Sequence, residues 1–535
     1  MKCISDFGNL FFNNLGTGVD KTTSPNEENL ITKIFILFIF IFSNSNLVGQ
    51  SNLDSIVYQK KRIEFKIQDL DRNFWVKENK INFLILKDVE SGKYLNWIFK
   101  LYNKELKLIN DTTISLDRSY TIVKISSDKN NYNLFFKKNY SNEKEYLFIR
   151  YNTLSNSFIT KEIKLPLSLS IRNILFIDEK IILLSSLRNG KNLVSVYNTL
   201  SGQLNNIYEY LYYDNEIINI YKSQLSSFYV LLSKVDENNF KVVERKDYTL
   251  NNKSLNTYVI QSSNKSIIHS KLLSHNDTDY YVSLVGKKNS NEANGFQINI
   301  LNKDSLSKNK EINFLQIPDL INFFSNENKI FQKKIKNKNV ENLKLGYEFF
   351  IDTLFILNDE IHFAFESLKA NFTNDGFSNY SYMPFYNSYS GRYDNKINPK
   401  FGGFTHDISI YLISDLSANI KWASINKIHD LNTFYKKPYK NYILKNDQII
   451  DFYVNKGKIT LSRKKLFNKD KMDKAVLDLN SEKEFIVLTN ETNPEGTIHW
   501  YNNNYLSYGI QKIKKRNTNK VSSDRVFFIS NYEIN

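Results

Sequence analysis

The stretch Tyr151-Asn152-Thr153-Leu154-Ser155 recurs 46 residues later as Tyr197-Asn198-Thr199-Leu200-Ser201, within a chain of 535 residues. Each copy of this Tyr-Asn-Thr-Leu-Ser marker closes one strand-like run of apolar residues and precedes another. The leucines of these copies and of weaker ones stand at positions 106, 154, 200, 250, 306 and 416, which gives separations of 48, 46, 50, 56 and 110 residues. A recurring separation of this size indicates a repeat architecture.

Four short strands fit between successive markers. For the second copy they are Asn173–Ile177, Lys180–Ser186, Asn192–Asn198 and Gln203–Tyr208, and the marker occupies the turn between the third and fourth strands. Four strands with three tight turns use about 40–50 residues, the length of a β-propeller blade. A β-helix would repeat at about half this length and an immunoglobulin-like sandwich at about 100 residues. The sequence therefore predicts an all-β propeller of four-stranded blades.

The strand pattern divides into seven provisional units, so seven blades are favoured, with six or eight also allowed. Residues 54–78 are a candidate for the strand that closes the ring. The units cover residues 80–116, 118–166, 170–210, 214–262, 265–316, 345–424 and 438–535.

Two insertions interrupt the period between Leu306 and Leu416. The first, 318–344, has apolar residues at 320, 324, 331 and 335 and an Asp319 start signal, which predicts a surface helix. The second, 369–406, is an aromatic-rich stretch without a period of 2 or 3.6, which predicts a long loop.

Tyrosine-rich loops with Ser, Gly and Asn supply contact area at low entropic cost, so this loop is the candidate partner-binding site. The alternatives are a loop that folds over a blade edge or plugs the mouth of the propeller with its own aromatic rings, which is the favoured structural interpretation, and a loop that lacks order. His406 ends the loop, and Asp407 could orient it; the other interpretation is a histidine at the start of a strand. The candidate binding residues are Phe377, Tyr380, Tyr382, Phe385, Tyr386, Tyr389, Tyr393 and His406.

Residues 1–50 have the composition of a leader with a signal peptide. Lys33 precedes an apolar core at 34–42, and a small, polar stretch follows it. Nine apolar residues are too few to cross a hydrocarbon core that needs about 20. A cleaved signal is favoured over a retained anchor or a chance run. The sequence thus predicts an exported, periplasmic, envelope-associated or secreted chain, 51–535, that forms a single propeller domain without a transmembrane span.

Composition narrows the functional classes. The formal charge of +16 could indicate an anionic partner, but the lysines are spread through turns, which favours a solvated surface and no nucleic acid. The only cysteine is Cys3, in the leader, and the six histidines lack metal-ligand spacing. Nucleophile-elbow and phosphate-binding glycine motifs are absent from the sequence. We expect no metal, no cofactor and no catalytic residue that a motif can name.

Two stretches carry a resemblance to a known group. Gly402–Asp407, continuing through Asp415-Leu416 to Trp422, and His499–Gly509 with Arg525–Ile529 resemble uncharacterised secreted or periplasmic proteins of Bacteroidetes-type bacteria. The likeness lies mainly within 345–535. It departs at Ala418 and Asn419, where such hairpins usually carry Gly. The resemblance implies a propeller in a bacterial envelope and transfers no activity.

These patterns favour an exported, non-enzymatic binding or scaffolding propeller that engages a protein or glycan partner. The alternative is a glycan-active hydrolase or lyase that uses carboxylates at the central funnel. A third interpretation is a small structural component of a surface or secretion complex without a ligand of its own. The sequence leaves the oligomeric state and the identity of the partner open.

Overall fold

The fold is described from a computed structural model. It covers residues 57–139, 144–165, 170–187, 190–211, 216–223, 227–262, 264–276, 278–288, 290–302, 305–327, 347–373, 385–387, 392–394, 400–434, 436–468, 473–478, 485–492, 496–516 and 523–534.

The chain divides into two compact units. Unit 1 is Met1–Lys60 with Tyr532–Asn535. In its described part, Lys60 Nζ lies 3.0 Å from Glu533 Oε2, and the Tyr532 hydroxyl donates to Gln59 Oε1 at 2.9 Å. Unit 2 is Lys61–Asn531 and contains most of the residues of the propeller.

The described strands form eight blades, each a sheet of at least four strands. Seven blades are built from strands that follow one another along the chain. Blade 1 is β2 (Asp71–Glu78), β3 (Phe83–Ser91), β4 (Tyr94–Tyr102) and β5 (Leu108–Asp117). Blade 2 is β6 (Tyr120–Ser127), β7 (Asn131–Lys138), β8 (Lys144–Asn152) and β9 (Ser157–Leu165). Blade 3 is β10 (Ser170–Ile177), β11 (Lys180–Ser186), β12 (Asn192–Asn198) and β13 (Leu204–Ile207), followed by the 3-10 turn η1 (Tyr208–Leu211).

Blade 4 is β14 (Glu216–Lys222), β15 (Ser227–Val235), β16 (Lys241–Thr249) and β17 (Ser254–Ile260). Blade 5 is β18 (Ser266–His275), β19 (Thr278–Gly286), β20 (Ala293–Asn302) and β21 (Ser305–Asn313), followed by η2 (Phe314–Gln316). Blade 6 is β22 (Glu348–Leu357), β23 (Glu360–Thr373), β26 (Lys400–Asp415) and β27 (Ile420–Lys427), with β28 (Asn432–Thr433) beside β26. Blade 7 is β29 (Asn441–Lys445), β30 (Gln448–Asn455), β31 (Lys458–Lys465) and β32 (Asp473–Asp478).

Blade 8 combines the two ends of the described chain. Its order is β1 (Val57–Lys66), β36 (Asp524–Ile534), β35 (Asn504–Lys515) and β33 (Phe485–Asn490), with β34 (Gly496–Tyr501) also paired to β35. Within unit 2, the Arg62 guanidinium lies between the Phe485 and Phe528 rings, 4.6 and 4.5 Å from their centroids. Its Nη2 donates to Gln511 Oε1 at 2.7 Å. These contacts fasten β1 to β33, β35 and β36.

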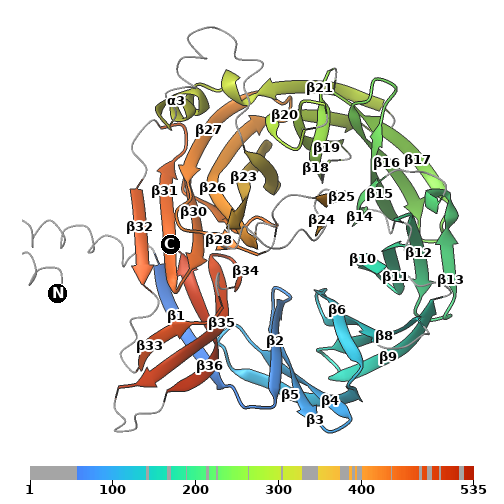
Figure 1. Cartoon of the computed structure of the whole chain (residues 1–535), viewed down its shortest axis with the longest axis vertical. Coiled ribbons are helices and arrows are strands. Elements are labelled where there is room, and N and C mark those ends of the chain that lie inside the picture. Colours follow the sequence, from blue (N-terminus) through green and yellow to red (C-terminus); the bar gives the residue numbers. More distant parts are fainter. Residues whose placement is uncertain are drawn as a thin grey trace, which may run out of the picture. The chain divides into compact units, whose positions relative to one another are not determined.

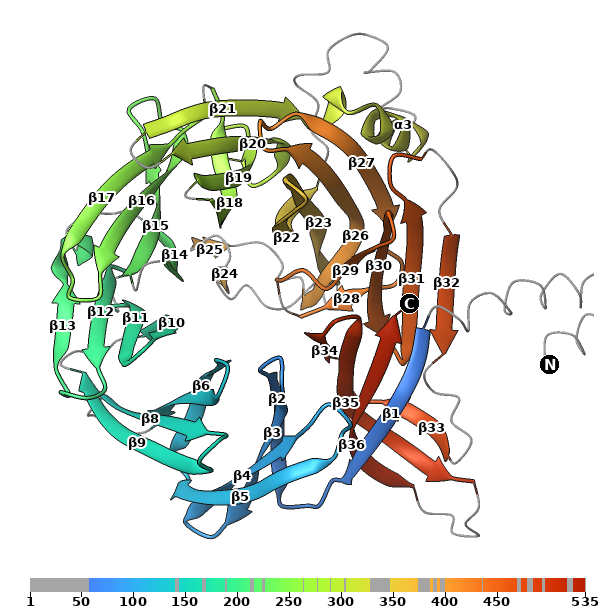
Figure 2. The same cartoon turned by 180° about the vertical axis from the view of Figure 1, so that it is seen from behind.

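Seven blades, the favoured number, is therefore wrong, and the eight found are within the allowed range. The unit 438–535 contains the whole of blade 7 and four strands of blade 8. The closing strand predicted within 54–78 is β1, whereas β2 opens blade 1. In each of blades 1–5 the fourth strand lies at the outside of the ring and the first at the inside (Figures 1 and 2).

The Tyr-Asn-Thr-Leu-Ser marker forms the turn between the third and fourth strands, as predicted. Asn198 Oδ1 accepts from the backbone N–H groups of Leu200 and Ser201 at 2.9 and 3.3 Å, an Asx turn. The backbone N–H of Thr199 donates to the carbonyl of Glu179 at 2.9 Å, in the turn between the first and second strands. The marker thus ties two turns at the same end of one blade, and Leu200 is 75% exposed.

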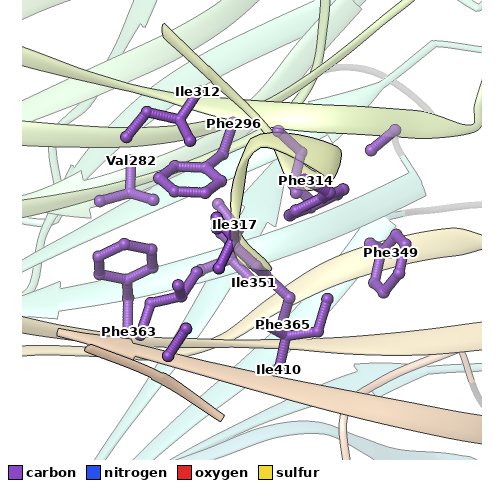
Figure 3. Close-up of a cluster of buried hydrophobic side chains, with 14 of the residues drawn as sticks. Val282, Phe296, Ile312, Phe314, Ile317, Phe349, Ile351, Phe363, Phe365 and Ile410 are labelled. Carbon is purple, nitrogen blue, oxygen red and sulfur yellow. The ribbon is translucent and has the colours of Figure 1, made fainter. Parts of the chain in front are cut away.

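The core lies between blades, because a single four-stranded sheet cannot bury both of its own faces. Figure 3 shows the cluster between blades 5 and 6, where Phe296 of β20 meets Phe363 and Phe365 of β23. The Phe296 ring centroid is 5.3 Å from that of Phe363 and 5.4 Å from that of Phe365. Such aromatic packing removes large apolar areas from water and fixes the angle between neighbouring blades.

The predicted helix in the first insertion is α3 (Pro318–Glu327). It contacts β27, and its Leu320 and Phe324 are buried, as the apolar spacing predicts. Positions 331 and 335 lie outside the described residues. Within the part of the chain that the structure describes, no helix has both the length and the apolar character needed to span a membrane.

Candidate functional site

The innermost strands of blades 1–6 each break their register with the second strand once, a β-bulge or similar irregularity. Bulges re-aim a side chain and often stand next to functional sites. In blades 1–5 the residue after the break is polar. We call these five residues the bulge row: Asn73, Lys124, Asn173, Asn219 and His269.

Three members of the bulge row are linked across blades 2, 3 and 4. Lys124 Nζ donates to Asn173 Oδ1 at 3.3 Å, and Asn173 Nδ2 donates to Asn219 Oδ1. The Asn219 side chain also bonds the Tyr221 hydroxyl, and the Tyr221 ring stacks on Tyr229 at 5.2 Å. The inner wall there presents, in order, an ammonium, two amides and a phenol.

The Lys124 side chain is exposed and has no carboxylate partner among the described residues. Partial burial and the nearby Lys77 of β2 lower the pKa of the Lys124 ammonium. Lys77 itself lies 3.3 Å from Glu78. The wall where blades 1 and 2 meet is therefore electropositive at Lys124.

A second polar group lies between β18 and β22. The backbone N–H of Ile351 donates to His269 Nδ1 at 3.5 Å, and Lys271 Nζ donates to the carbonyl oxygen of Asp352. Burial, with the charges of Lys271 and Lys436, lowers the pKa of His269 to about 4. His269 is thus neutral at physiological pH.

Asp352 lies in the register break of β22. Its Oδ2 is buried and has no hydrogen-bond partner among the described residues. Burial, and then the charge of Glu366, raise the pKa of the Asp352 carboxyl well above its usual range, although Lys271 and Lys440 oppose this. A buried carboxyl in this environment favours its neutral form.

His406 is buried, with 1% of its surface exposed. Its Nδ1 contacts Glu366 Oε1, and its Nε2 lies 3.1 Å from Thr433 Oγ1. The predicted orienting partner, Asp407, does not hold either ring nitrogen in the bonds that the structure gives, because Glu366 occupies Nδ1. His406 therefore belongs to the interior of blade 6, not to an exposed loop surface.

Glu366 ties this histidine to the start of blade 7. It is fully buried and accepts from the backbone N–H groups of Tyr439 and Lys440 at 3.0 and 3.1 Å. The Lys440 ammonium in turn pairs with Asp451 of β30 and donates to Ser409 Oγ at 2.9 Å. Acid, histidine and lysine thus form a closed internal network that fastens blade 7 to blade 6.

The aromatic insertion is only partly described. Phe377, Tyr380, Tyr382 and Tyr389 lie outside the described residues. The strands β24 (Phe385–Asn387) and β25 (Arg392–Asp394) pair with Tyr386 opposite Tyr393. β23 also pairs with β26 from Lys369, which lies opposite Thr405, to Thr373, which lies opposite Lys400. Strand structure therefore extends into both ends of the predicted loop. The binding role of these aromatic residues stays a prediction.

Sequence reasoning missed the bulge row. The sequence feature that marks a member of the bulge row is a single polar residue within a run of apolar, β-branched residues. Examples are Ile217-Ile218-Asn219-Ile220 and Ile267-Ile268-His269. Such a residue reads as an ordinary polar position of a half-buried strand until the sheet register is known. Among the described residues, no group of three His, Cys, Asp or Glu side chains could hold a metal ion.

No family model matches the chain. No curated protein is similar to it either. It is similar in structure to the WD40 domain of SCAP from fission yeast, with a TM-score of 0.39 and 10% identity, covering 88% of this chain and 97% of that one. The polysaccharide lyase Uly1 gives 0.37 and 8%, covering 77% and 89%, and an acylaminoacyl peptidase of Pyrococcus horikoshii gives 0.32 and 10%, covering 75% and 52%. Similarity at this level indicates no activity for this chain. The number of blades is taken from the order of strands in the sheets.

Proposed function

We propose that this chain is an exported, non-enzymatic β-propeller that binds or scaffolds a protein or glycan partner in a bacterial envelope. The observation that carries the proposal is the contrast between two polar sets. The exposed part of the inner wall carries Lys124 and linked amides, groups that bind by charge and hydrogen bonds. Glu366 and His406, an acid and a base in contact, are buried and bonded to the protein itself.

General acid–base catalysis needs a group within hydrogen-bond reach of substrate. Glu366 already accepts from two backbone N–H groups and contacts His406, which supports a structural role for that pair. The tyrosines of the aromatic insertion suit a second contact surface, since tyrosine provides amphipathic area with few rotatable bonds.

A glycan-active hydrolase or lyase is the second candidate, and Asp352 is the observation that favours it. A carboxyl with a raised pKa on an innermost strand could serve as a general acid. The acid that acts on it most strongly is Glu366, which is enclosed in the network of blades 6 and 7. This arrangement gives the catalytic candidate less support than the binding one.

The two candidates differ in one measurement. The purified full chain would be incubated with labelled neutral and anionic oligosaccharides, and with envelope proteins, while retention and product length are both followed. We expect saturable retention of a partner and unchanged oligosaccharide length. Time-dependent shortening or new unsaturated ends, lost in Asp352→Asn, would overturn the binding proposal in favour of catalysis.

Export has a separate test. Sequencing the N-terminus of the protein from its own cells should give a start after the apolar core at 34–42. A start upstream of Phe35 in the protein from the cell envelope would overturn the cleaved-signal proposal.

A further inference from the structure

We propose that the inner wall formed by β6, β10 and β14 binds an anionic oligosaccharide, with its acidic group at Lys124 and its hydroxyl groups along Asn173, Asn219 and Tyr221. This inference rests on the proposed binding function and assigns it a ligand class and a place. It concerns the innermost strands, a part of the chain separate from the aromatic insertion.

Lys124 is the anion-binding group. Its ammonium stands on an innermost strand, is exposed, and bonds an amide oxygen instead of a carboxylate. Three other lysines of blades 1 and 6 and their neighbouring segments have carboxylate partners: Lys77 lies 3.3 Å from Glu78, Lys87 lies 3.0 Å from Asp71, and Lys436 lies 2.6 Å from Glu348. No carboxylate contributes to the environment that shifts the pKa of Lys124, whereas Lys77 adds positive charge. An anion placed there would meet attraction without displacing a protein carboxylate.

The groups next to Lys124 are those that recognise sugar hydroxyls. Asn173 and Asn219 follow equivalent bulges in neighbouring blades, and one amide bonds the other. Each Asn Oδ1 also accepts from the next backbone N–H, Ile174 at 2.8 Å and Ile220 at 2.9 Å. These bonds fix both amides in position, so they are preorganised for a ligand.

Tyr221 extends the row by an aromatic ring. Its hydroxyl bonds the Asn219 side chain, and its ring stacks on Tyr229, which holds it in place. A cation, two fixed amides and a fixed aromatic group, each bonded to the next, suit a sugar chain that carries a carboxylate or a sulfate. A neutral sugar would leave the charge of Lys124 unused, and a bare inorganic anion would leave the amides unused.

The test compares two substitutions that remove the same charge from one blade. Lys124→Gln changes the inner wall of blade 2. Lys161→Gln changes an exposed lysine on β9, the outer strand of the same blade, which has no ion pair among the described residues. Binding would be measured by calorimetry with tri-galacturonate (carboxylated), a sulfated galactan oligosaccharide and a neutral cello-oligosaccharide, and equal melting temperatures would show that both variants fold.

We expect wild type to bind an anionic probe more tightly than the neutral one, with affinity falling as salt is raised. Lys124→Gln should weaken that binding about 10-fold, the effect of one charge-assisted hydrogen bond. Lys161→Gln should stay within about 2-fold. Asn173→Ala should weaken anionic and neutral probes alike, because it removes a hydroxyl contact and leaves the charge. Preference between the two anionic probes identifies the acidic group.

Equal effects of Lys124→Gln and Lys161→Gln would overturn the site, as would wild type that prefers the neutral probe. If a protein or neutral glycan is then retained by wild type and by Lys124→Gln alike, the general binding function stands and only this inference fails. If every probe is cleaved, the proposed function fails first.

Discussion

Replacing Glu366 by alanine should free the segment that joins blade 6 to blade 7. The carboxylate accepts from the backbone N–H groups of Tyr439 and Lys440 at 3.0 and 3.1 Å and contacts His406 Nδ1. His406 in turn meets Thr433 at 3.1 Å. Without the carboxylate, the two backbone N–H groups and the His406 ring lose the acceptor on β23 that they share.

The magnitude follows from the number of donors left without a partner. A buried donor without an acceptor costs about 1–3 kcal/mol. Two backbone N–H groups and one ring nitrogen are affected, and water entering the vacated volume offsets part of the cost. We therefore expect Glu366→Ala to lower the free energy of unfolding by about 4 kcal/mol. Glu366→Gln keeps one acceptor oxygen and should lose about half as much.

Urea unfolding followed by tryptophan fluorescence measures this change, since Trp422 lies on β27 of the same blade. Hydrogen exchange at the Tyr439 and Lys440 amides measures the local effect. The matched control is Glu237→Ala, which alters an exposed turn residue and should stay within about 0.5 kcal/mol. A loss below about 1 kcal/mol, together with unchanged exchange at both amides, would refute the structural role of Glu366.

Thr199→Val removes the hydroxyl bonds to the Glu179 carbonyl and carboxylate, and should lower the free energy of unfolding in urea by about 1 kcal/mol. Leu200→Ala should leave it unchanged. Equal losses in the two variants would contradict the role of Thr199 in joining the two turns. His269 has a pKa of about 4 in the folded chain and about 6.5 unfolded, so its contribution is complete above pH 6.5 and is lost as pH falls toward 4. Wild type should therefore lose about 2 kcal/mol more stability between pH 7.5 and 5 than His269→Gln; parallel profiles would contradict the shift. Arg62→Ala removes a guanidinium held between two rings and should cost about 2 kcal/mol and speed hydrogen exchange in β1; unchanged exchange there would contradict its closing role.

Local sequence predicted blades 2–5 well because each is built from consecutive hairpins with its own turn chemistry, whereas the unit predicted for blade 1, 80–116, left out its first strand β2. The four strands predicted for blade 3 match β10–β13 to within a few residues. The marker turn was predictable for the same reason, since an Asn side chain bonds N–H groups only two and three residues later.

The blade number was not predictable in this way. Closing the ring pairs β1 with β36, strands separated by most of the chain, and a local period contains no information on such a pairing. The sequence of blade 7 also gives no sign of the backbone bond between its turns. The backbone N–H of Leu466 donates to the carbonyl of Asp447 at 2.7 Å, the bond that Thr199 makes in blade 3, but leucine stands there in place of threonine.

The candidate site shows the same limit. His406 was singled out for its place at the end of the aromatic insertion, yet its environment is set by Glu366 and Thr433, 40 residues before it and 27 after it. Lys124 was one lysine among many, and only the bulge and its neighbours in the adjacent blades distinguish it.

The backbone bond that joins the turn between the third and fourth strands to the turn between the first and second strands has a consequence for how the number of blades can evolve. In blades 2, 3 and 7 both of its ends lie in one contiguous segment, so an unequal crossover that copies or deletes such a segment carries the bond whole or removes it whole. Neighbouring blades keep their own bonds either way. Blade number is then a quantity that recombination could change in single steps. The bond itself does not fix the residue type, because its donor is a backbone N–H group that threonine supplies in blade 3 and leucine in blade 7.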